Sequence, residues 1–71
     1  MATNATHLSP AALRMAYDSL AGQATWTHAS KEWAVDVANA LARLPGAVYQ
    51  DRARDLDQRV YAWEVQGRGR A

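Results

Sequence analysis

The stretch AVYQDRARDLDQRVYAWEVQ, residues 47–66, repeats its apolar side chains with the period of an α-helix. These positions are four, three, four and three residues apart: Tyr49, Ala53, Leu56, Val60 and Trp63. Such spacing places them on one face of a helix. Asp55 and Arg59 also form a favourable pair four residues apart. We therefore predict a helix over residues 47–66, ended by Gly67 and Gly69.

A second helix is predicted over residues 10–21, near the start of the chain. Ser9 is suited to the N-cap and Pro10 to the first helical position, where its missing N–H costs nothing. The next apolar residues again share one helical face: Leu13, Tyr17 and Leu20. Gly22 is expected to end this helix in a left-handed conformation.

A third helix is predicted between these two, over residues 28–44. Its apolar face contains Trp33, Val37, Ala40, Leu41 and Leu44. Its start is open, because Thr27 and Ser30 are both acceptable N-caps. The pair Pro45-Gly46 is expected to end it.

Three amphipathic helices with short connections predict an all-α fold, a small three-helix bundle in one domain covering residues 1–71. Residues 1–8 are expected to form a disordered N-terminus, and residues 67–71 a short, flexible basic tail. Two topologies fit equally well. One is a compact bundle, and the other is a helical hairpin with the first helix packed across it.

The composition predicts a lean core. Of the 35 apolar residues, 16 are Ala, and the chain has neither Phe nor Ile. We expect the three Trp and three Tyr to supply much of the burial, because each aromatic buries roughly 150–250 Å². A core this small favours a partner that completes it, either a larger protein or a second copy in a homo-oligomer.

Composition also argues against several classes of function. The chain has no Cys, which excludes disulfides and thiolate metal sites. No apolar run is long enough for a membrane span, and the N-terminus does not resemble a signal peptide, so we expect a cytoplasmic protein without membrane contact. The net charge of +1 does not by itself imply nucleic acid.

The segment TWTHASKEW, residues 25–33, resembles a compact site at first reading. His28, Glu32 and Asp36 are four residues apart and offer ligand chemistry for a divalent metal. The same stripe is typical of a solvated helix boundary, which we favour. Trp26 is expected to fold over the end of the bundle, with its indole N–H reaching a partner. We predict no catalytic residue, metal, cofactor or small-molecule substrate.

The outer side of residues 47–66 is the favoured site. Arg54, Gln58, Tyr61 and Val65 lie opposite Leu56 on the helix. Arg and Tyr are enriched in interface hot spots, so these four residues are predicted to bind a protein partner. Met15 and Val35 are expected to face outward on the other two helices.

An alternative is an accessory nucleic-acid binder, which would use Arg52, Arg59, Arg68 and Arg70 to contact phosphates. The leading hypothesis is a non-enzymatic interaction module. A short chain rich in Ala and Arg is in keeping with small regulators or inhibitors from bacterial mobile elements such as phages and plasmids.

Overall fold

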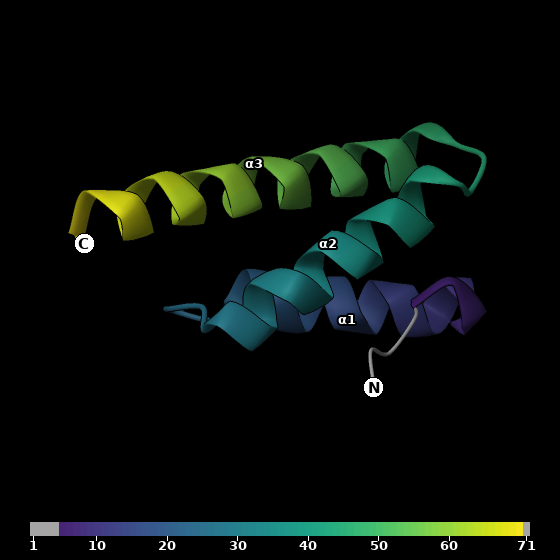
Figure 1. Ribbon diagram of the computed structural model, residues 1–71. Helices are drawn as coiled ribbons and strands as arrows, with labels where there is room; N and C mark the ends of the chain where they lie inside the picture. Colours follow the sequence, from purple (N-terminus) through teal and green to yellow (C-terminus); the bar gives the residue numbers. More distant parts are fainter. Residues whose placement is uncertain (1–4, 71) are drawn as a thin grey trace.

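The fold is all-α, and the predicted three-helix bundle is confirmed (Figure 1). A computed structural model describes residues 5–70, with the side chains of all of these except Thr6 and residues 67–70. A short 3₁₀ helix precedes three α-helices: η1 (Ala5–His7), α1 (Pro10–Gly22), α2 (His28–Ala42) and α3 (Ala47–Arg70). Residues 5–70 contain no strand.

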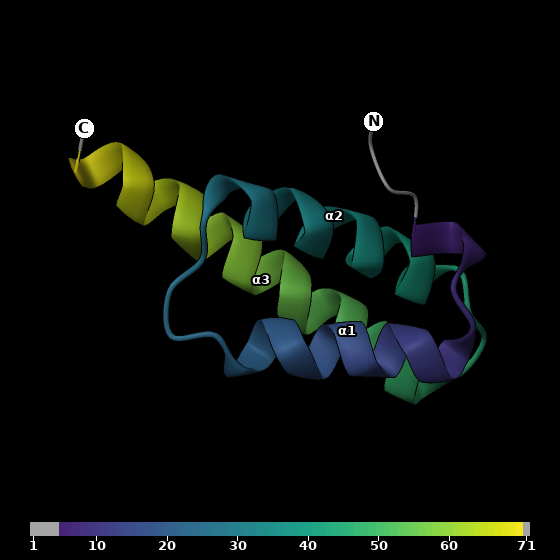
Figure 2. The same cartoon turned by 90° about the horizontal axis from the view of Figure 1, so that it is seen from below.

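Helix α2 lies between the other two helices and packs against both. Its most extensive interface is with α3, to which a four-residue connection joins it, while η1 and α1 pack on its other side. Helices α1 and α3 run in the same general direction and contact each other little (Figures 1 and 2). Of the two topologies left open, this arrangement is the compact bundle, with α2 as its central helix.

The core is built from small and medium aliphatic side chains. Its eleven buried residues are Ala5, Leu13, Leu20, Ala34, Val37, Ala38, Ala40, Leu41, Ala53, Leu56 and Val60. Five of them are Ala, as the lean composition indicated. None of the six aromatic residues is fully buried. Tyr17, Trp26, Trp33 and Tyr49 pack against the core as partly buried side chains, Trp63 is also partly buried, and Tyr61 is exposed.

The N-caps of α1 and α2 are Ser9 and Thr27. Ser9 accepts a hydrogen bond from the Ala12 N–H at 3.2 Å, and Pro10 occupies the first turn, as predicted. Thr27 caps α2, because its hydroxyl accepts from the Ser30 N–H at 3.1 Å. Helix α2 therefore begins at His28, in agreement with the predicted range.

The C-terminal ends of α1 and α2 differ from the predictions. A left-handed Gly22 was expected to end α1, and Pro45-Gly46 was expected to end α2. Gly22 is the last residue of α1 and does not have positive φ, so its predicted role is wrong. Instead, the Leu20 carbonyl accepts from the Gln23 N–H and from the Trp26 indole. Helix α2 ends at Ala42 rather than residue 44. The Gln50 amide reaches back from α3 and donates to the Ala42 and Leu44 carbonyls.

Two predictions at the chain ends also need correction. Helix α3 continues through Gly67 and Gly69 to Arg70, because each glycine costs a helix only about 1 kcal/mol. The expected disordered segment 1–8 contains η1, where the Leu8 N–H donates to the Ala5 carbonyl and Ala5 is fully buried. Its methyl group is small enough to enter the core beside α2. Residues 1–4 and 71 lie outside the described part of the chain.

Leu56→Ala should lower the free energy of unfolding by about 2–5 kcal/mol, because Leu56 is fully buried and the core is too small to refill the space. Urea unfolding followed by circular dichroism measures the change. Met15→Ala is the matched control, since Met15 is 72% exposed. Equal losses in the two variants would contradict this account of the core.

Candidate functional site

The predicted interaction stripe lies on the exposed side of α3. Tyr61 is 71% exposed and Val65 is 49% exposed, although both are large apolar residues. Arg54 and Gln58 are exposed on the same side of the helix. The Arg54 guanidinium lies 3.6 Å from the Asp51 carboxylate, which holds it loosely along the helix surface. The four predicted residues therefore share one solvent-facing surface, which we call the outer stripe.

A second group of exposed apolar side chains lies away from the outer stripe. Met15 faces outward, as predicted, and is 72% exposed. Val35 does not: it is half-buried and packs against the core, because α2 is covered on two sides. Val48 is 57% exposed and was missed by the sequence reasoning. The sequence did carry a sign of this exposure: Val48 precedes Tyr49 by one residue and so lies outside the apolar face of α3.

Met15 and Val48 lie on opposite walls of a groove between α1 and α3. The groove has a volume of about 750 Å³ and is lined by the first turns of both helices, together with Tyr49, Arg14, Asp18 and Arg52. It exists because α1 packs mainly on α2 and leaves the first turn of α3 uncovered. Its walls are more apolar than polar, which is typical of a binding surface rather than of a solvated helix face.

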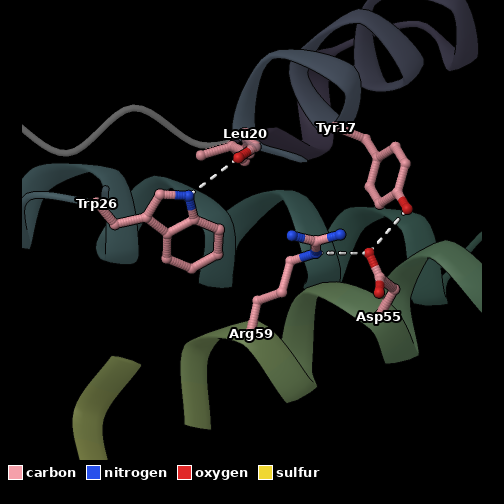
Figure 3. A network of polar contacts seen from close by, with 5 residues as sticks. All are labelled: Tyr17, Leu20, Trp26, Asp55 and Arg59. Carbon is pink, nitrogen blue, oxygen red and sulfur yellow. Dashed lines mark hydrogen bonds and ion pairs between the residues drawn. The ribbon is translucent and has the colours of Figure 1, made fainter. Parts of the chain in front are cut away.

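A polar network ties α1 to α3 beside this groove (Figure 3). The Tyr17 hydroxyl donates to the Asp55 Oδ2 at 2.8 Å, and the Arg59 Nε donates to the same oxygen at 2.8 Å. Arg52 lies over the Tyr17 ring at 5.8 Å from its centroid, which is within cation–π range. The pair Asp55 and Arg59 was predicted from spacing, whereas the role of Tyr17 depends on the tertiary fold.

The three groups of this network shift one another's pKa. Partial burial alone would raise the pKa of Asp55, but the hydrogen bonds from Arg59 and Tyr17 and the Arg59 charge lower it overall. The hydrogen bond to Asp55 raises the pKa of Tyr17, and burial adds to this effect. The hydrogen bond to Asp55 also raises the pKa of Arg59. The network therefore holds an ionised carboxylate between two groups that keep their protons.

The segment TWTHASKEW forms a structural joint. The Trp26 indole N–H donates to the Leu20 carbonyl at 3.0 Å, which confirms the prediction that it reaches a partner at the bundle end (Figure 3). The Trp63 indole N–H in turn donates to the Trp26 carbonyl at 2.9 Å. Two indoles thus connect the end of α1, the start of α2 and the second half of α3.

His28 and Glu32 lie at the margin of this joint. Their side chains approach to 3.6 Å, and both are about two-thirds exposed or more. The His28 ring also lies 6.2 Å from the Trp63 ring. Within the described residues, no group of three His, Cys, Asp or Glu side chains is arranged to hold a metal ion, so His28, Glu32 and Asp36 do not converge.

Two arginines of the nucleic-acid alternative, Arg52 and Arg59, lie on the side of α3 that faces α1. Arg59 is bonded to Asp55, and Arg52 lies over Tyr17. The side chains of Arg68 and Arg70 lie outside the described part of the chain. The described part of the chain therefore shows two of the four arginines, and both already contact groups of α1 or α3.

Comparison with known protein families, with curated proteins and with solved structures finds no match for this chain. Among the helices of the described residues, none combines the length and the apolar character needed to cross a membrane. The outer stripe and the groove are therefore interpreted from their own geometry and chemistry.

Tyr17→Phe should lower the free energy of unfolding by about 0.5–1 kcal/mol, because it removes one hydrogen bond in a network that water reaches. Tyr61→Phe removes the same hydroxyl from an exposed ring and should change stability very little. Chemical unfolding of both variants under one buffer condition gives the comparison. A loss for Tyr61→Phe as large as that for Tyr17→Phe would argue against the network.

The lowered pKa of Asp55 predicts a specific acid sensitivity. Its contribution to stability is present above the ordinary carboxyl pKa of 3.8 and disappears as the pH falls through the lower value of the folded state. The stability difference between the wild type and Asp55→Asn should therefore be constant near neutrality and shrink below about pH 4. Urea unfolding across this range measures it, and a difference independent of pH would contradict the prediction.

Proposed function

We propose that this chain is a small non-enzymatic interaction module that binds a larger protein through the outer stripe of α3. The observation that carries the proposal is the exposure of Tyr61 and Val65 on the side opposite the core. A helix that only completed a bundle would not need large apolar side chains there. The adjoining Arg54 and Gln58 add polar contacts of the kind found around interface hot spots.

The shape of the molecule supports this proposal. A helix of 24 residues presents the stripe over several turns, on a rigid element that is held by the core on its other side. A rigid helical face loses little conformational entropy when a partner covers it. The outer stripe is therefore suited to docking into an apolar groove of a larger protein.

Self-association is the second form that the interaction takes in this proposal. Among the side chains that the structure describes, eleven are buried core residues and five of these are Ala, so further apolar burial between copies would add stability. A dimer formed through α3 would use the same stripe twice, as a two-fold interface requires. Measurement of the molar mass in solution separates this form from binding to another protein.

The biological role within this proposal is regulation or inhibition of the bound protein. Support comes from the Ala- and Arg-rich composition, which is in keeping with proteins of bacterial mobile elements. The cytoplasmic location expected from the sequence stays part of the proposal. The nucleic-acid alternative receives less support, because Arg59 is already bonded to Asp55.

Replacing the stripe should abolish binding without unfolding the protein. The double variant Tyr61→Ala with Val65→Glu is expected to lose the partners that the tagged wild type retains from its source cells, identified by mass spectrometry. It should also lose any concentration-dependent increase in molar mass. Asn39→Glu is the matched control, because it places the same added charge on an exposed position of α2.

Two results would contradict the proposal. If the double variant kept both partner capture and molar mass, the outer stripe would not be the interface. If the folded wild type were monomeric and retained no specific protein, the class of function itself would be wrong. Circular dichroism of each variant confirms that the helical fold is intact.

A further inference from the structure

We propose that the groove between α1 and α3 is a second binding site, and that it takes an apolar helical segment of a partner protein flanked by acidic side chains. This inference goes beyond the proposed function, because the groove is on another side of α3. Val48 and Tyr61 are thirteen residues apart, which separates them by about 140° around the helix. One surface can therefore be occupied while the other is free.

The groove is large enough for several side chains of a docked helix. Its volume of about 750 Å³ lies within the range of protein binding pockets, about 300–1,000 Å³. Met15 on α1 and Val48 on α3 stand on its two walls, 72% and 57% exposed. A helix lying between them would cover both, and it would pack against α1 and α3 as a fourth member of the bundle.

The charge around the groove selects an acidic partner. Arg14 and Arg52 approach from the two walls, and Asp18 is the acidic residue among the lining. Asp18 is only loosely paired with Arg14, at 3.9 Å between two exposed side chains. Within the described residues, no carboxylate lies within ion-pair distance of Arg52, which lies over the Tyr17 ring instead. A carboxylate on a bound segment would give Arg52 an ionic partner.

The backbone adds to this positive potential. The first turns of α1 and α3 both line the groove, and neither contains an acidic residue. Gly46 precedes α3 with a φ of 118° and has no side chain to cap the first N–H groups of that helix. The partial positive charges at these two helix N-termini therefore add to the positive potential of Arg14 and Arg52 in the groove.

A second copy of this chain is a less suitable occupant. Its exposed apolar stripe contains Arg54, which would meet the like charges of Arg14 and Arg52. The stripe and the groove are also different surfaces, so this contact would be heterologous and would build rings or open chains rather than the two-fold dimer that is commonest among oligomers. Charge and symmetry thus both favour a different, acidic protein segment.

Two synthetic peptides of about four helical turns test the proposal on the purified full chain. Both carry Leu at helical spacing, one with flanking Glu and the other with Lys at the same positions. By fluorescence anisotropy, the Glu peptide should bind at least about tenfold more tightly, because like charges oppose the Lys peptide. Amide shifts in NMR spectra should cluster in residues 10–18 and 46–52.

Charge reversal in the groove gives the decisive comparison. Arg14→Glu with Arg52→Glu should reverse the preference between the two peptides, whereas Arg54→Glu on the outer stripe should leave it unchanged. Met15→Ser should weaken the binding of the Glu peptide without altering the fold, since Met15 is mostly exposed. Circular dichroism confirms the helical content of each variant.

Several outcomes would overturn the inference. These are no binding of either peptide by the folded chain, equal binding of both, shifts confined to residues 54–65, or self-association that Met15→Ser abolishes. Each can occur while partner capture through Tyr61 and Val65 persists. A result that rules out peptide binding in the groove is therefore distinguishable from one that rules out the proposed function.

Discussion

Helix α2 is buried on two sides, and every other described element is held in place by packing against it. Ala34 and Ala38 are buried together with Val37 and Leu41, so both neighbours can approach this helix closely. Because these side chains are small, the core that they form buries little apolar area. Apolar residues that the core cannot accommodate, such as Tyr61 and Val48, remain at the surface, where they become available for binding.

Polar contacts join α1 and α3, which the apolar core holds together only weakly. Helix α1 contacts α3 little, and the bond from Tyr17 to Asp55 joins these two helices at one level. Arg59 keeps that carboxylate ionised, and Arg52 lies over the Tyr17 ring toward the groove. The groove and the network are therefore two results of the same geometry: α1 meets α3 at Tyr17, and the first turn of α3 stays uncovered.

Sequence periodicity predicted the three helices and the buried positions Leu13, Leu41, Leu56 and Val60, because each helix has one strongly apolar face. It also predicted the exposure of the outer stripe. It did not predict the burial of Ala5 or Ala38, since alanine carries too weak a signal to reveal a second packed side. The groove and the bond of Tyr17 depend on how two helices cross, which a single-helix pattern does not contain.

The contact between Tyr17 and Asp55 joins residues that are 38 positions apart, whereas α2 and α3 are joined by a tight turn at Gly46. Closing the larger loop costs more chain entropy than forming the hairpin. We therefore expect the two pairs joined by short connections, α1 with α2 and α2 with α3, to form before α1 meets α3. In kinetic terms, the groove is the last feature to form, because it needs both α1 and α3 in place on α2.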